Sequence, residues 1–95
     1  MNDLSLGSRF HKAVLASEGR DLCKAFGEVI SRRREALGLS LEAVATKAEL
    51  KEAGLGFVES GVGRPSLDTL CRVAYALGVT AADLIAESEE VAEII

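Results

Sequence analysis

The basic side chains are the residues of this chain whose chemistry points most clearly to a partner. Lysine and arginine neutralise phosphate groups when several of them gather on one face, and five such residues are Arg32, Arg33, Lys47, Lys51 and Arg64. The whole chain has a net charge of −4, with five acidic and no basic residues from position 83 onward. Between positions 20 and 82, nine basic residues stand against eight acidic ones. This near-neutral balance permits binding to nucleic acid without arguing for it.

The residue types that most often carry catalysis or bind metals occur here without their usual partners. Cys23 and Cys71 have neither a metal-binding nor a redox spacing, and both stand among apolar residues, so we interpret them as buried structural thiols. His11 is the only histidine, and without a partner at ligand spacing it is expected at the surface. The sequence shows no carboxylate pair, activated nucleophile or phosphate-binding loop. It therefore predicts a protein that is not an enzyme and has no metal or cofactor.

The basic residues lie in and around a stretch, residues 38–67, that predicts two short helices folded across a tight turn. Ser40 is a good N-cap for a helix that begins at Leu41. A second helix follows Leu50 and ends at the strongest stop signals of the chain, Gly61, Gly63 and Pro65. The apolar residues expected to face inward from the two helices are Val44, Ala45, Ala48, Leu55 and Val58.

Helical periodicity continues on both sides of this stretch. An earlier helix between residues 20 and 37 has the apolar set Leu22, Phe26, Val29, Ile30 and Leu37. Ser66 caps a later helix that Gly78 ends, with the inner face Leu67, Leu70, Cys71, Ala74 and Leu77. Thr80 and Asp83 form a capping box for a last helix, in which Leu84 and Ile85 pack inward. Low aromatic content and abundant Ala and Leu favour an all-α fold.

An ordered series of residues and motifs links these elements to a known family. The series runs Phe26-Gly27, Ile30, Arg34, Gly38-Leu39-Ser40, Val44-Ala45, Val58-Glu59-x-Gly61, Pro65-Ser66-Leu67, Leu70, Ala74, Leu77-Gly78-Val79 and Asp83-Leu84. It resembles the helix-turn-helix of Cro and phage-repressor (XRE-type) regulators. The resemblance implies a five-helix, lambda-repressor-like DNA-binding domain at residues 20–86. An N-terminal extension with a short extra helix would occupy residues 1–19, and an acidic tail or helix extension residues 87–95.

The resemblance also implies which residues meet double-stranded DNA. The first helix of the motif would anchor to phosphate and the second would read bases in the major groove. Arg34 and Glu59 would form a structural ion pair between the earlier helix and the recognition helix. Glu49 stands where the family usually has glycine in the turn, and Gly54 lies inside the recognition helix. The family tolerates glycine at the position of Gly27, after an apolar residue, which suggests close approach of another element. The implied DNA-contact positions, which include no Gln, Asn or base-reading Arg on the recognition helix, are Ser40, Leu41, Lys51, Glu52, Ala53, Gly56, Phe57, Ser60 and Arg64.

Two terminal segments have open interpretations. Near the N-terminus, Phe10, Ala13, Val14 and Leu6 suggest a short amphipathic helix interrupted near Gly19, which is either a loose leader or an extra packing or dimer element. Near the C-terminus, the choice is between a frayed acidic tail and a helix whose apolar residues contact a second copy. The residues expected in that dimer contact are Leu84, Val91, Ile94 and Ile95.

Two classes of function remain from the sequence. The first is a sequence-specific DNA-binding transcription regulator that acts as a homodimer. The second is an interaction module, such as an antitoxin or adaptor, that keeps the fold but binds a protein through the apolar Leu55-Gly56-Phe57 surface or the acidic C-terminus. Without a signal peptide or a long apolar span, the sequence predicts a cytoplasmic location and no membrane partner.

Overall fold

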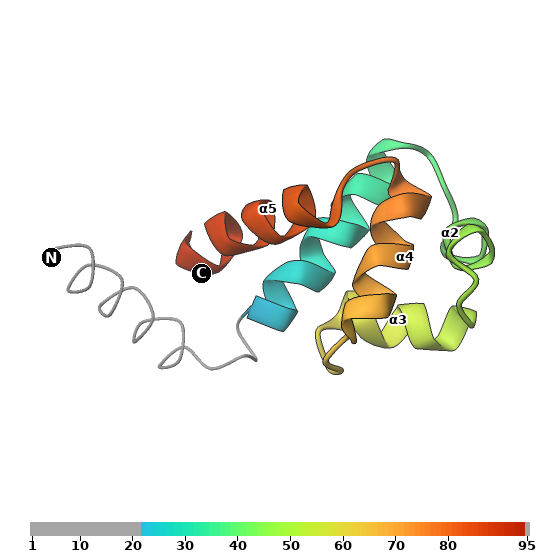
Figure 1. Ribbon diagram of the computed structural model, residues 1–95, viewed down its shortest axis with the longest axis horizontal. Helices are drawn as coiled ribbons and strands as arrows, with labels where there is room; N and C mark the ends of the chain where they lie inside the picture. The colour runs from blue at the N-terminus through green and yellow to red at the C-terminus, as the bar shows by residue number, and fades with distance from the viewer. Residues whose placement is uncertain (1–21, 95) are drawn as a thin grey trace, which may run out of the picture.

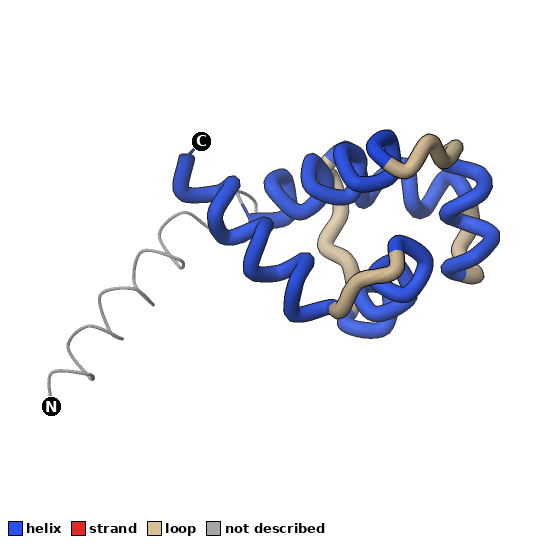
Figure 2. The backbone as a smooth tube through the Cα atoms, turned by 90° about the horizontal axis from the view of Figure 1, so that it is seen from above, coloured by secondary structure: helices blue, strands red, loops and turns tan. Residues whose placement is uncertain are grey.

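The computed structural model describes the backbone of residues 22–94 and the side chains up to Ala92. Within that range the backbone forms five helices joined by short loops and has no strand, as Figures 1 and 2 show. The first helix occupies residues 22–36, followed by α2 (Leu41–Ala48), α3 (Glu52–Ser60), α4 (Leu67–Leu77) and α5 (Ala81–Ile94). The expected all-α class is confirmed. The N-terminal segment with His11, Phe10 and Val14 lies outside the described residues, as do the side chains of Ile94 and Ile95.

Capping side chains set the helix starts that the sequence predicts. The Ser40 hydroxyl accepts the backbone N–H of Ala43 at 3.0 Å, and the Ser66 hydroxyl accepts that of Thr69 at 3.1 Å. At the start of α5 the Thr80 hydroxyl accepts the Asp83 N–H at 3.0 Å, while Asp83 accepts the Thr80 N–H at 3.4 Å. These bonds satisfy backbone donors that have no partner within the helix. The predicted caps are confirmed.

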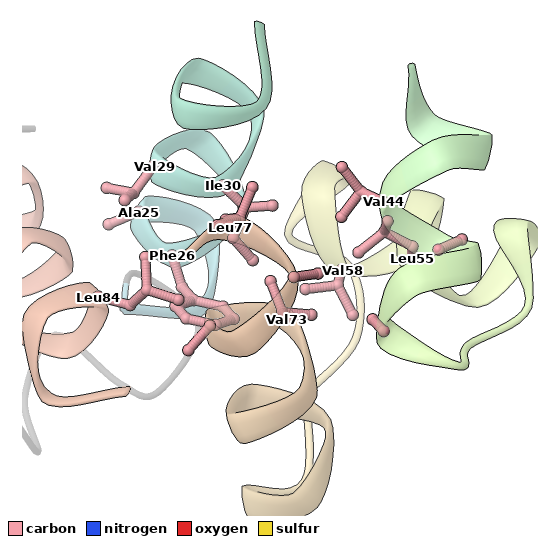
Figure 3. Close-up of a cluster of buried hydrophobic side chains, with 14 of the residues drawn as sticks. Ala25, Phe26, Val29, Ile30, Val44, Leu55, Val58, Val73, Leu77 and Leu84 are labelled. Atoms are coloured by element: carbon pink, nitrogen blue, oxygen red, sulfur yellow. The ribbon is translucent and has the colours of Figure 1, made fainter. Parts of the chain in front are cut away.

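Side chains from all five helices converge on one small core (Figure 3). Val44 of α2 and Leu55 of α3 lie on one side of α4, and Phe26 of the first helix and Leu84 of α5 lie on the other. Val73 of α4 stands between them and is fully buried. The inward faces predicted for α2 and α3 are confirmed, because Val44, Ala45, Ala48, Leu55 and Val58 are all buried.

Three residues that the sequence analysis assigned to the interior are at the surface. Leu37 is 54% exposed because the first helix ends at residue 36 and Gly38 takes a left-handed conformation directly after it. Leu67 is 75% exposed, and Cys71 is exposed as well. The buried stripe of α4 contains Val73, Ala74, Ala76 and Leu77. Ala74 and Leu77 are confirmed as inner-face residues and Leu70 packs against the core, while Val73 and Ala76 take the inward places expected of Leu67 and Cys71. Cys71 is not a buried structural thiol, and Cys23 is only half-buried.

The inner face of α5 turns toward the chain's own core. Leu84 is fully buried and Val91 is 8% exposed, and between them the buried Ser88 hydroxyl donates to the Leu84 carbonyl at 2.6 Å. Arg33 of the first helix also pairs with Glu87 of α5 at 2.7 Å. The expectation that Leu84 and Val91 contact a second copy is therefore wrong for these two side chains, since the protomer itself covers them. The helix continues past residue 87 without a break.

Among the described residues, no single helix is long and apolar enough to cross a membrane. The one pair of helices that reaches the length and composition together, Leu67–Leu77 with Ala81–Ala92, bends by 99° between its halves.

Candidate nucleic-acid interface

One side of α3 is held against the core while the other side is open to solvent. Leu55 and Val58 face inward at 0% and 8% exposure. The outward positions begin at Lys51, the N-cap of α3, whose side chain makes no capping hydrogen bond. Lys51 therefore leaves the backbone N–H groups of the first turn of α3 uncapped. Exposed residues then continue along the helix through Glu52, Ala53, Phe57 and Ser60. This is the side that the sequence analysis assigned to DNA.

An ion pair fixes α3 from behind. Arg34 of the first helix donates from Nε and Nη2 to both carboxylate oxygens of Glu59 at 2.7 and 3.1 Å, and from Nη1 to the Leu39 carbonyl at 2.9 Å. Both side chains are largely buried, at 16% and 12% exposure. The hydrogen bond to Glu59 is the main cause that raises the pKa of Arg34 above its usual value. Because the pair is bidentate and shielded, it sets the position of the C-terminal part of α3 relative to the first helix.

A close backbone contact adds to this anchor. A Cβ atom at Gly27 would lie 2.4 Å from the Val58 carbonyl oxygen and 2.5 Å from that of Glu59. The prediction that Gly27 marks the close approach of another element is confirmed, and the element is α3. At the end of α3, Gly61 takes a φ of 78° and lies against the backbone of Lys24. The first helix therefore supports α3 through atoms that leave no room for a larger side chain at either glycine.

The turn before α3 contains the single described residue other than glycine with a positive φ. Glu49 has φ 59° and ψ 45°, the left-handed conformation in which glycine is usual. Its backbone N–H caps α2, and its carboxylate forms an ion pair with Arg72 of α4 at 3.2 Å. Arg72 also bonds to Asp68 at 2.7 Å, and these contacts, led by the one to Asp68, raise the pKa of Arg72. The turn thus takes the left-handed conformation with a residue other than glycine.

Ion pairing leaves few cations free for a phosphate backbone. Within the described chain, Arg32 pairs with Glu28, Arg33 with Glu87, and Arg34 with Glu59. No ion pair between described residues involves Lys51 or Arg64, and both line one groove of about 240 Å³ between α3 and the loop to α4. Lys47 lies on a different face, 5.8 Å from the centre of the Tyr75 ring. The candidate basic face therefore consists of Lys51 and Arg64.

The predicted contact residues divide between this groove, the rest of α3 and the start of α2. Phe57 lines the groove with Lys51 and Arg64, and it is 60% exposed. Ser60 is exposed, but its hydroxyl donates to the Phe57 carbonyl at 2.7 Å, so only its lone pairs are free. At the start of α2, Ser40 is exposed and Leu41 is half-buried. A Cβ atom added at Gly56 of α3 would lie 3.7 Å from Leu41 Cδ2. Gly56 therefore faces Leu41 in part, which leaves it less open than its neighbours on α3.

Ser66 and Thr69 are not among the contact positions that the resemblance implies. Both line the groove beside Arg64. The signal that could have pointed to them is their place in the chain, because the first turn of α4 directly follows the Gly63-Arg64-Pro65 loop.

Two short helices crossing at a turn, with the second presenting its outer side to solvent, define the class of helix-turn-helix proteins. The helix-turn-helix family model matches residues 30–84, more than half of the chain, and the chain belongs to this family. The expected membership of the XRE-type helix-turn-helix family is confirmed. Members of this class are DNA-binding transcription regulators.

Solved structures of regulators resemble this chain. It is similar to the restriction-modification controller protein C.AhdI from Aeromonas hydrophila, with 32% identity and a TM-score of 0.64 over 65% of this chain and 94% of that one. It is also similar to the clp gene regulator ClgR from Corynebacterium glutamicum, with 26% identity and a TM-score of 0.73 over 77% of this chain and 78% of that one. The competence regulator ComR from Streptococcus vestibularis is 35% identical over 68% of this chain but only 22% of its own, with a TM-score of 0.64. Comparison with curated proteins gives no match.

Proposed function

We propose that this protein is a sequence-specific, homodimeric transcription regulator that lays α3 in the major groove of double-stranded DNA. One observation carries the proposal. Lys51, Phe57 and Arg64 share a groove on the open side of α3, while the nearby arginines of the first helix are held in ion pairs. With DNA as its partner, we propose that it acts in the cytoplasm.

The side chains of this face suit particular contacts. Arg64 would bind phosphate, and Lys51 would reach either phosphate or the acceptor atoms of guanine. Glu52 would accept a hydrogen bond from the N4 amino group of cytosine, and Phe57 or Ala53 would touch a thymine methyl group. At the start of α2, backbone amides near Ser40 and Leu41 would meet a second phosphate. With one base-reading cation on the helix, discrimination by each protomer would be modest.

Pairing of two protomers would compensate for this short set of contacts. Two copies related by a twofold axis would place their α3 helices in half-sites about 34 Å apart, one turn of DNA. The operator would then be a palindrome. Each protomer supplies the same two cations, so a dimer doubles the phosphate contacts without any new residue.

A charge-removal series tests the proposed docking face. Lys51→Ala and Arg64→Ala should weaken binding to all sequences, because each removes a phosphate-neutralising charge. Each lost contact should lower the slope of log K against log salt by about 0.9 for a monomer and about 1.8 for a dimer. Lys47→Ala is the matched control, since it removes the same charge from another face and should leave the slope unchanged. Equal slopes in all three variants would reject this face.

A second function is favoured by the exposed apolar side chains at this end of the molecule. Phe57 is 60% exposed and Val62 is 75% exposed. A protein partner could bind these two side chains. Leu55 would take no part because it is fully buried, so Phe57 is the exposed side chain that remains of the surface expected from Leu55-Gly56-Phe57. Phe57→Ser should abolish capture of such a partner and leave thermal stability unchanged. Retained capture would reject this alternative.

A further inference from the structure

An apolar groove lies on the molecule next to the point where the described chain begins. It has a volume of about 260 Å³ and is lined by residues of the first helix, the loop before α4, α4 itself and α5. The lining side chains include Leu22, Cys23, Phe26, Leu67, Leu70 and Ile85. Leu67 at its edge is 75% exposed, whereas Phe26 is 3% exposed. A cavity of about 150 Å³ with such a lining holds a benzene ring, so this groove has room for an aromatic side chain.

The chain itself carries a segment with the pattern to fill this groove. Leu6, Phe10, Ala13 and Val14 recur at the spacing of one helix face, and Phe10 is the single aromatic residue before position 22. The segment is joined to the groove, because Leu22 is both the first described residue and part of the lining. Residues 15–21 connect the two and include Gly19. Antiparallel helices are commonly joined by loops of about 2–5 residues, so this connection is long enough for the segment to turn back along the first helix.

We propose that residues 6–14 of the chain's own N-terminal segment dock in this groove, with Phe10 as the anchor. The tether decides between the chain's own segment and that of a second copy. A short flexible linker gives an effective concentration in the millimolar range, whereas a second copy must also overcome the loss of translational and rotational freedom on association. A contact with one aromatic anchor therefore forms within the chain first.

Docking would support the loop that carries Arg64. Pro65 and Ser66 line this apolar groove and also line the groove that contains Lys51 and Arg64. A segment packed against Pro65 and Leu67 would thus restrict the loop between α3 and α4. This consequence rests on the proposed DNA-binding function, while the docking itself does not.

The two cysteines provide a test on the full chain without DNA. Cys23 lies in the groove and is half-buried, whereas Cys71 is exposed on another face and serves as an internal control. The experiment measures the alkylation rate of each thiol by mass spectrometry with iodoacetamide. Phe10→Ser should speed alkylation of Cys23 about ten- to a hundredfold, as expected for the loss of one buried aromatic side chain, and leave Cys71 unchanged. Arg9→Ser, the matched control beside it, should change neither rate.

A variant on the groove side gives a second measurement. Leu67→Ser should also speed alkylation of Cys23, while Val62→Ser, which alters an equally exposed residue outside the groove lining, should not. The proposal requires that the protection of Cys23 be the same at all protein concentrations. Protection that disappears on dilution would identify a second copy as the occupant and overturn the proposal. So would a Cys23 rate that Phe10→Ser leaves unchanged.

Discussion

Gly54 of α3 and Gly27 of the first helix should respond in opposite ways to the same added methyl group. In the middle of a helix, Gly→Ala is worth about 1 kcal/mol of stability by propensity alone. Gly54 lies in the first turn of α3, where a Cβ atom would have no described atom within 4 Å, so Gly54→Ala should stabilise the fold by about 0.5–1 kcal/mol. At Gly27 the same atom would lie 2.4 and 2.5 Å from two carbonyl oxygens of α3, whereas ordinary contacts begin at 3.4 Å.

The methyl group at position 27 must therefore push the first helix and α3 apart by about 1 Å, the difference between those distances. Overpacking of this kind costs about 1–3 kcal/mol, and the upper end applies because both obstructing atoms are backbone. After the gain in propensity, Gly27→Ala should lower the free energy of unfolding by about 1–2 kcal/mol. For a domain of this size, 1 kcal/mol moves Tm by about 4–8 °C, so the two variants should melt on opposite sides of the wild type.

The assay is urea and thermal unfolding followed by circular dichroism, with the two variants compared at one protein concentration. If Gly27→Ala is as stable as Gly54→Ala, the close contact between the first helix and α3 does not exist in solution, and the reasoning about how α3 is positioned fails.

Two other predictions concern the residues that hold α3 in place. Glu59→Ala leaves the largely buried Arg34 without its partner and should destabilise the fold by about 2–3 kcal/mol. Glu28→Ala breaks the exposed pair with Arg32, which lies on the first helix like Arg34. It should cost less than about 0.5 kcal/mol in the same unfolding assay. Equal effects of these two changes would contradict the structural role of the Arg34–Glu59 pair. Glu49→Gly removes the strain of a left-handed side-chain-bearing residue with φ 59° and should raise the free energy of unfolding by about 1 kcal/mol. This gain is expected even though the change removes an exposed contact with Arg72. A loss of stability would show that the turn is not strained.

The sequence predicted the helix boundaries well because local groups determine them. Ser40 and Ser66 supply caps, and Gly61 and Gly78 supply left-handed residues, at φ 78° and 76°, that end the helices. These are interactions over three or four residues, and their residue types show them directly. Gly27 was also informative, since the resemblance linked glycine at this position to a close neighbour.

The inner face of α4 was only partly predictable, and what covers the far end of α5 could not be predicted in the same way. Leu67 and Cys71 are as apolar as the residues that are buried, and only the positions of α2 and the first helix decide which stripe turns inward. For α5, the prediction that Leu84 packs inward is confirmed, but the apolar pattern around Val91 shows only that one face must be covered and not by what. The structure shows that the same protomer covers both.

The candidate site was predictable in position but not in charge. The resemblance located the outer side of α3, which the structure shows to be exposed. Which cations are free depends on contacts between distant residues, such as Arg33 with Glu87, 54 positions apart. A count of basic residues gives five candidates, and the packing of the helices leaves Lys51 and Arg64 together beside α3.

The most direct measurement for the central claim is selection of duplex DNA from a random-sequence pool by the full chain at two salt concentrations. The proposed function predicts enrichment of a palindrome with half-sites one helical turn apart and an affinity that falls steeply as salt rises. No enrichment, together with no binding at the lower salt concentration, would contradict it and show that the fold serves a protein partner instead.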